Sequence, residues 1–160
     1  MQEVKKYNTY EELMDLIDQS GESYDLDLIN KAYELAFNAH KGQKRTLGED
    51  YIVHPVSVAY ILVELGMDTT AVCAGLLHDV VEDTEVTKEE IEEKFGTEIA
   101  NLVDGVTKLD KISSSSVREE EQAENIRKIL LATAQDIRVI MIKLADRLNN
   151  MRTIDSRPPQ

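Results

Sequence analysis

The chain lacks the features of a secreted or membrane-bound protein. Its single cysteine, Cys73, rules out an internal disulfide and favours a reducing compartment. No apolar run is long enough to cross a bilayer, and residues 1–6 are not followed by the apolar segment of a secretion signal. We therefore expect a cytoplasmic protein without a membrane partner. The apolar neighbours of Cys73 indicate that its thiol packs in the core.

Basic side chains are also scarce. The 18 Lys and Arg residues are outnumbered by 31 Asp and Glu residues, which gives a net charge of −13 at pH 7. This balance argues against direct nucleic-acid binding, because that needs a basic face. A single small phosphorylated ligand stays compatible if a metal or a local basic cluster receives it. Residues 41–45, Lys-Gly-Gln-Lys-Arg, form such a cluster, although a short basic run is more often a solvated loop.

The sequence does contain strong helical signals. Capping boxes begin at Thr9 and Thr87, Pro55 suits the first turn of a helix, and Asp68 and Asp136 suit helix N-caps. The 160 residues, 42% of them hydrophobic, are enough for one domain with a substantial core. We find no convincing strand alternation and no internal repeat. The expected fold class is therefore all-α, a non-repetitive helical bundle.

Two further expectations concern the C-terminal third. The serine run at residues 113–116 breaks the helical pattern, and a helix is expected to begin at Ser116 and to run past Leu130. On the last helix, Lys143, Asp146, Asn150 and Thr153 recur at spacings of three and four, so they share one face. The opposite, apolar stripe is the predicted core face, which comprises Ile137, Ile140, Met141, Leu144, Leu148 and Met151.

A histidine and an aspartate, His78 and Asp79, lie together in an apolar stretch. A buried imidazole or carboxylate needs a partner. One solution is a divalent cation that is also bound by His54 and Asp146, because two imidazoles and two carboxylates leave positions open for water and substrate. The alternative is a buried His–Asp hydrogen bond without a metal. With three histidines in the chain, a His-rich dinuclear site is not expected.

Two acids follow the pair at helical spacing. Glu82 lies four residues after His78, and Asp83 lies four residues after Asp79. If one helix carries all four residues, the acids project beside the candidate metal site. The alternative is a solvated acidic helix end, which the helix dipole disfavours.

Five stretches carry a resemblance to a known family. The sequence resembles the hydrolase domain of the RelA/SpoT homologue family, bacterial enzymes that make and destroy the alarmone (p)ppGpp. The similarity extends from about Tyr24 to Arg157. The matching stretches are residues 39–45 (Ala-His-Lys-Gly-Gln-Lys-Arg), 51–55 (Tyr-Ile-Val-His-Pro), 76–84 (Leu-Leu-His-Asp-Val-Val-Glu-Asp-Thr), 102–109 (Leu-Val-Asp-Gly-Val-Thr-Lys-Leu) and 136–153, which contains Lys-Leu-Ala-Asp-Arg.

The resemblance implies an HD-type helical fold and an activity. It implies Mn²⁺-dependent hydrolysis of (p)ppGpp, which releases pyrophosphate from the 3′ position and leaves GDP or GTP. It also implies that residues 1–160 are a single hydrolase domain, truncated from a longer bifunctional enzyme whose synthetase and regulatory domains are missing here. The implied metal ligands are His54, His78, Asp79 and Asp146, the implied catalytic acids are Glu82 and Asp83, and the residues expected to bind substrate are Arg45, Thr46, Lys143, Asn150 and Thr153.

Two departures from the family pattern keep other functions open. Thr46 replaces a lysine, which favours a phosphohydrolase of another nucleotide, and Asn149 replaces a histidine beside the site. A catalytically inactive domain that only binds alarmone or a partner domain is the alternative from a different class. The retained residues His78, Asp79 and Glu82 argue against that alternative.

Overall fold

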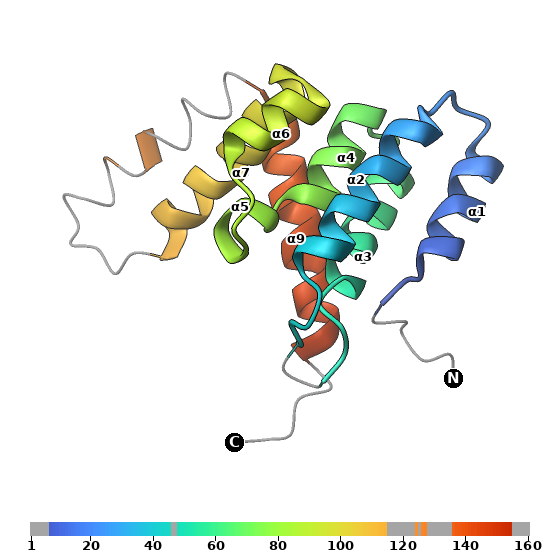
Figure 1. Cartoon of the computed structure of the whole chain (residues 1–160), viewed down its shortest axis with the longest axis horizontal. Coiled ribbons are helices and arrows are strands. Elements are labelled where there is room, and N and C mark those ends of the chain that lie inside the picture. The colour runs from blue at the N-terminus through green and yellow to red at the C-terminus, as the bar shows by residue number, and fades with distance from the viewer. Residues whose placement is uncertain (1–6, 46–47, 115–123, 125, 128–135, 155–160) are drawn as a thin grey trace.

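The computed structural model describes residues 7–45, 48–114, 124, 126–127 and 136–154. Over these ranges the chain is helical, apart from loops and one isolated β-bridge between Lys44 and Asp50, which confirms the all-α prediction. Among the described helices, none combines the length and the apolar character needed to span a membrane. The helices are α1 (Tyr10–Ser20), α2 (Leu26–Ala39), α3 (Val53–Glu64), α4 (Thr69–Leu77), α5 (Val80–Asp83), α6 (Lys88–Phe95), α7 (Thr97–Ser114) and α9 (Arg138–Ile154) (Figure 1).

The predicted caps set the helix starts. The Thr9 hydroxyl accepts a hydrogen bond from the Glu12 amide at 3.1 Å, and the Glu12 carboxylate accepts one from the Thr9 amide, which completes the capping box of α1. The side chains of Asp68, Thr87 and Asp136 accept hydrogen bonds from backbone amides at the starts of α4, α6 and α9. α7 continues through Ser114, and the helix expected from Ser116 falls mostly outside the described residues.

The core lies around α3 and α4, which are apolar on nearly every side because other helices surround them. Gly75 of α4 makes this close packing possible: a Cβ atom there would lie 2.6 Å from Leu62 Cδ1 of α3. Cys73 is fully buried, as expected, and burial raises the pKa of its thiol to about 12. The two central helices thus form a rigid base for the residues at their ends.

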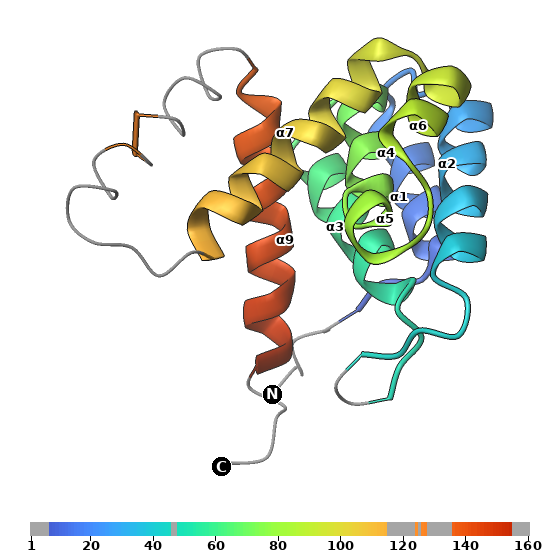
Figure 2. The same ribbon diagram turned by 60° about the vertical axis from the view of Figure 1, so that its left-hand side comes forward.

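The predicted core stripe of α9 is wrong for most of its residues, although Ile140 and Met141 are partly buried and pack against the core. Leu144 is 55% exposed and Met151 is 63% exposed, whereas the buried apolar residues are Val139, Ile142 and Ala145. The buried face of α9 is instead the one that carries Asp146 and Asn149, because these polar side chains meet His54 of α3 and His78 in the turn after α4. Figure 2 shows α9 along one side of the bundle, with α7 crossing it. The exposed stripe comprises Ile137, Leu144, Leu148 and Met151.

The helix expected to carry the His–Asp pair is also interrupted. α4 ends at Leu77, His78 and Asp79 form a turn, and α5 starts at Val80. Neighbouring residues of a continuous helix point about 100° apart. His78 and Asp79 nevertheless keep right-handed dihedral angles (φ −60°, ψ −31° and φ −98°, ψ −5°), and His78 Nε2 lies 3.0 Å from Asp79 Oδ2, so both side chains reach the same site.

Candidate metal centre and active site

Four side chains from three parts of the chain converge in the interior. His54 comes from the first turn of α3, His78 and Asp79 from the turn between α4 and α5, and Asp146 from the middle of α9. His54 Nε2 lies 2.6 Å from Asp146 Oδ1, and His78 Nε2 lies 3.3 Å from the same oxygen. Both imidazoles are 1% exposed and Asp146 is 6% exposed, so the cluster is shielded from water.

Hydrogen bonds on the outer sides aim the imidazoles inward. His78 Nδ1 donates to the Gly75 carbonyl at 2.6 Å, and His54 Nδ1 donates to Asn149 Oδ1 at 2.7 Å. Each ring therefore directs Nε2 toward the carboxylates. Metal-binding histidines are commonly oriented in this way by a second hydrogen bond. Asn149, which the sequence placed only beside the site, is fully buried and acts as the partner of His54.

The charges of the cluster are strongly coupled. Burial alone lowers the pKa of His78, but the Asp79 and Asp146 carboxylates outweigh burial and raise this pKa well above 6.5. Burial alone raises the pKa values of Asp79 and Asp146, but hydrogen bonds and charge from the imidazoles hold both well below their usual range. Without a cation, the protein thus stabilises the charged form of His78 beside the Asp79 and Asp146 carboxylates.

The donor set fits one divalent ion. One donor atom from each of the four residues lies within 4.8 Å of the others. Around an ion with bonds of about 2.1 Å, neighbouring ligands lie about 3 Å apart and opposite ligands about 4 Å apart. The separations of His78 from Asp79 (3.0 Å) and of His54 from Asp79 (3.9 Å) are of this size. Imidazole and carboxylate ligands suit several divalent metals, so the set indicates a metal site without selecting the element.

The two acids of α5 lie in different surroundings. Glu82 groups with Asp79 and Asp110, each offering a carboxylate oxygen within 4.8 Å of the others. Asp83 accepts a hydrogen bond from the Tyr51 hydroxyl at 3.3 Å. Partial burial and the charge of Asp79 raise the pKa of Asp83. Both acids thus lie beside the candidate metal site, Glu82 next to Asp79 and Asp110, and Asp83 next to Tyr51.

Tyr51 connects the candidate metal site to the loop before α3. Its hydroxyl donates to Asp79 Oδ2 at 2.7 Å, and its ring lies under the Arg45 guanidinium at 5.6 Å from the centroid. The remaining histidine, His40, is buried, and its ring packs on Tyr51 at 4.6 Å. Burial lowers the pKa of His40, so this imidazole is a neutral support for Tyr51 and lies outside the metal cluster.

Arg45 and Asn150, both expected to bind substrate, lie together although 105 residues separate them. Arg45 Nη2 donates to Asn150 Oδ1 at 2.9 Å, and Arg45 Nε donates to the Tyr7 hydroxyl at 3.2 Å. Thr46 lies outside the described residues, and Thr153 belongs to α9 but its side chain is not among those described. Of the five residues expected to bind substrate, the structure therefore describes the side chains of Arg45, Asn150 and Lys143, and it pairs Arg45 with Asn150.

A surface cleft of about 690 Å³ is lined in part by Asp83. Its lining includes three acids and no lysine or arginine, so it is unsuited to a phosphorylated ligand. We therefore expect phosphate to approach from the Arg45 side. The lining residues are Asn38, Ala39, Gln43, Asp83, Thr84, Glu85, Val86 and Glu90.

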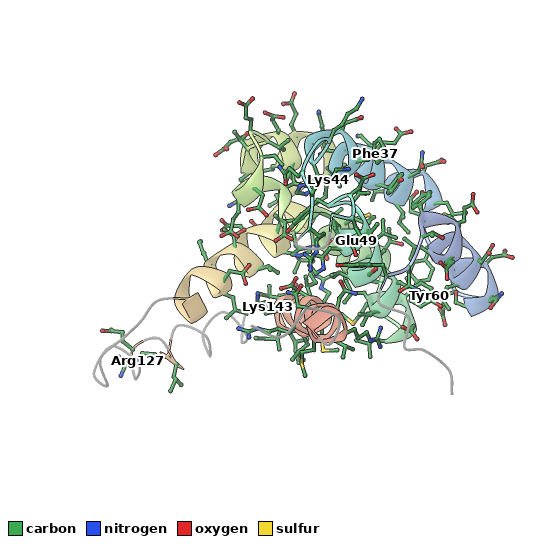
Figure 3. The ribbon with its side chains drawn as sticks, turned by 90° about the horizontal axis from the view of Figure 1, so that it is seen from below. Phe37, Lys44, Glu49, Tyr60, Arg127 and Lys143 are labelled. Carbon is green, nitrogen blue, oxygen red and sulfur yellow. The ribbon has the colours of Figure 1, made fainter. Side chains whose placement is uncertain are left out.

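Lys143 points from α9 toward α7 (Figure 3). Its ammonium donates to Asp146 Oδ2 at 3.0 Å and forms an ion pair with Asp110. Sequence reasoning gave no role to Asp110, although it directly follows the matching stretch at residues 102–109. Tyr51 was also given no role from the sequence, although this residue opens the matching stretch at residues 51–55.

Comparisons with known proteins agree with this fold. The family model described as HD domain matches residues 32–160. A Myxococcus xanthus relative named GTP pyrophosphokinase is 58% identical over 133 residues, which cover 82% of this chain and 18% of the relative. A Vibrio cholerae relative named guanosine-3′,5′-bis(diphosphate) 3′-pyrophosphohydrolase is 49% identical over 150 residues, which cover 94% of this chain and 21% of the relative.

A solved structure is similar over a larger share of its own length. It is a metazoan orthologue of SpoT, described as hydrolysing ppGpp, and it matches with a TM-score of 0.66 and 29% identity, covering 87% of this chain and 76% of that one. The chain thus spans a small part of the curated relatives and most of the structural neighbour. These matches confirm the resemblance to RelA/SpoT homologues, and the chain belongs to the HD domain family.

Proposed function

We propose that this chain is a Mn²⁺-dependent hydrolase domain that releases pyrophosphate from the 3′ position of (p)ppGpp. The observation that carries the proposal is the convergence of His54, His78, Asp79 and Asp146 beside the acid Glu82. A buried cluster of this composition, open to acids on one side, suits metal-assisted hydrolysis. The substrate comes from the similarity to the Vibrio relative, named a guanosine-3′,5′-bis(diphosphate) 3′-pyrophosphohydrolase, and to the metazoan neighbour, described as hydrolysing ppGpp.

Each group of residues has a distinct task in the proposed reaction. When bound, the ion supplies Lewis acidity that activates water and polarises the 3′ phosphoryl group. Glu82, together with Asp83, orients the attacking water and accepts its proton. Arg45 and Asn150 hold the nucleotide at the rim, and Thr46 and Thr153 stay predicted contacts there. Lys143 stays a predicted source of positive charge for the phosphate oxygens.

The proposal extends to the whole protein. Because the chain spans 21% of the Vibrio relative, we propose that it is the hydrolase domain of a longer bifunctional enzyme with synthetase and regulatory domains. The single cysteine favours action in the cytoplasm, where thiols stay reduced.

A second function has one observation in its favour. The Myxococcus relative, 58% identical, is named for the synthetic direction, GTP pyrophosphokinase. That name is compatible with a domain of this fold that binds alarmone without hydrolysing it and regulates a synthetase in the same protein. The acids Glu82 and Asp83 beside the metal cluster favour hydrolysis over this alternative.

One assay separates these functions. The chain is incubated with ppGpp, pppGpp, GTP and other nucleotides in the presence of Mn²⁺, and pyrophosphate and phosphate release are followed. We expect pyrophosphate release from ppGpp or pppGpp that stops on chelation of the metal and is absent in Asp79→Ala. Binding of ppGpp without release would support the regulatory domain, and release from another nucleotide would support a different phosphohydrolase.

A further inference from the structure

The ammonium of Lys143 lies between carboxylates of two different helices. It donates to Asp146 Oδ2 on its own helix at 3.0 Å and forms an ion pair with Asp110 of α7. The three side chains are 18%, 9% and 19% exposed, so water screens these charges only weakly. Lys143 is thus held between the two carboxylates and does not extend into solvent.

This contact gives the two oxygens of Asp146 different tasks. Oδ1 faces the imidazoles, at 2.6 Å from His54 and 3.3 Å from His78, whereas Oδ2 faces Lys143. A carboxylate that is hydrogen-bonded through one oxygen presents the other to an ion in a fixed direction. Lys143 therefore favours one-oxygen binding by Asp146.

The same ammonium also opposes cation binding, because it places a positive charge beside the metal ligands. Asp110 offsets that charge and holds the ammonium on the α7 side of α9. Asp110 also lies within 4.8 Å of Asp79 and Glu82, measured between carboxylate oxygens, so its negative charge is close to the proposed ion.

We propose that Asp110 is a positioning residue of the metal centre, which holds Lys143 against the outer oxygen of Asp146 and neutralises its charge. The inference rests on the metal site of the proposed function. It gives Lys143 a task in shaping the metal site and predicts that two oppositely charged residues act on metal affinity in opposite directions.

The test measures Mn²⁺ affinity by calorimetry, with no nucleotide present. Removing the negative charge in Asp110→Asn should weaken Mn²⁺ binding by about tenfold, because Lys143 then lacks its counter-charge. Removing the ammonium in Lys143→Met should tighten binding by a similar factor. The double variant should return close to the wild-type affinity, and Asp110→Glu, which keeps the charge, should retain most of it.

A matched control lies on the same helix. Asp104 of α7 pairs with Lys108 at 2.9 Å and with Lys88 at 3.6 Å, away from the metal ligands, so Asp104→Asn should leave Mn²⁺ affinity unchanged. The melting temperature without metal is measured for every variant to confirm that it folds.

The outcomes separate the inference from the proposed function. If wild type binds Mn²⁺ but Asp110→Asn and Lys143→Met both weaken binding, or neither changes it, the pair is only a packing contact and the inference is overturned. If Asp110→Asn does not fold, a loss of affinity in Asp110→Glu as large as that of Asp79→Ala would overturn it equally. If wild type binds no Mn²⁺, the proposed metal site itself is wrong.

Discussion

His78 links metal binding to protons. Its pKa in the metal-free protein is raised well above 6.5 because the Asp79 and Asp146 carboxylates outweigh the effect of burial. At neutral pH the ring therefore carries a proton that a bound metal must displace. We expect Mn²⁺ binding near pH 7 to release about one proton per site, and affinity to fall as the pH is lowered. Calorimetry in two buffers of different ionisation enthalpy measures the release, and identical heats in both buffers would contradict it.

The same shift affects stability without metal in the opposite sense. Because the folded-state pKa of His78 is raised, its pairing stabilises the metal-free fold fully below pH 6.5, the ordinary pKa of histidine. This contribution is lost as the pH rises through the folded-state value. The depressed pKa values of Asp79 and Asp146 add stability that is present above their ordinary value of 3.8 and is lost on acidification.

Glu82 is the acid expected to act on water. Glu82→Gln keeps the size of the side chain and removes its basicity, so we expect metal binding to persist while hydrolysis slows by roughly 10²-fold or more. Asp79→Ala should instead lose metal and activity together. Glu89→Gln on the exposed face of α6 serves as the control. A wild-type rate in Glu82→Gln would show that another group accepts the proton.

Arg45 is one of two described cations, with Lys143, among the residues predicted to bind substrate. Arg45→Ala removes the donor that meets Asn150, so we expect KM for ppGpp to rise more than kcat falls. A charge-assisted contact contributes about 1.5–3 kcal/mol, which corresponds to an affinity loss on the order of tenfold to a hundredfold. Nucleotide affinity is measured for Arg45→Ala and for the control Lys44→Ala. The Lys44 ammonium pairs with Asp50 in the unsubstituted protein. Equal affinities in both variants would show that Arg45 does not contact the substrate.

At the scale of elements, the residues that cap helices were easier to predict from sequence than the buried faces of the helices. Thr9, Asp68 and Asp136 act within three residues of themselves, so their hydrogen bonds follow from local sequence. The buried face of α9 depends on partners more than 60 residues away, such as His78 for Asp146. Periodicity identified a polar and an apolar face but took the apolar face as the core. The buried face of α9 combines the apolar residues Val139, Ile142 and Ala145 with the polar residues Asp146 and Asn149, so for most of the predicted stripe the expected burial is reversed.

This reversal predicts an unusual pattern of stability. Leu144→Lys replaces an exposed apolar residue and should change the free energy of unfolding by no more than about 0.5 kcal/mol. Ile142→Ala, two residues earlier on the buried face, should lower it by about 2–5 kcal/mol. Urea unfolding measures both variants. A large loss in Leu144→Lys would indicate that the apolar stripe of α9 packs in the core after all.

The turn at His78 and Asp79 shows a second limit of local reasoning. An apolar run that ends in acids favours one continuous helix, and the positions of Glu82 and Asp83 were predicted on that basis. α4 ends after Leu77, and His78 and Asp79 reach one site together with residues of α3 and α9, which local sequence does not specify. Glu82 and Asp83 still lie beside the candidate metal site because α5 begins at Val80.

At the scale of the whole molecule, the site joins segments that lie far apart in the chain. The resemblance pointed to His54, His78, Asp79 and Asp146, which the structure brings together, although their function as ligands stays a prediction. The contacts that orient them were not predictable, because Asn149 and Tyr51 meet their partners only through the packing of α9 and of the loop before α3. Local sequence and family motifs therefore indicate the candidate ligands better than the residues that orient them through hydrogen bonds.

This long-range arrangement predicts that metal binding stabilises the whole bundle. An ion held by α3, by the turn after α4 and by α9 binds the folded chain and has no assembled site in the unfolded one. At a Mn²⁺ concentration of about 100 times Kd, the added stability is about 2.7 kcal/mol, which should raise Tm by roughly 5–10 °C. Differential scanning calorimetry with and without Mn²⁺ measures the shift.

The matched variant for this last prediction is Asp146→Ala, which removes the ligand that both imidazoles contact. Its Tm should not respond to Mn²⁺, whereas Asp104→Asn should keep the full shift. Hydrogen exchange adds a local measurement: in wild type, Mn²⁺ should slow exchange together in the first turn of α3, around His78 and in the middle of α9. Slowing confined to one of these segments would mean that the ion binds there alone, because an ion shared by the three segments must stabilise all of them at once.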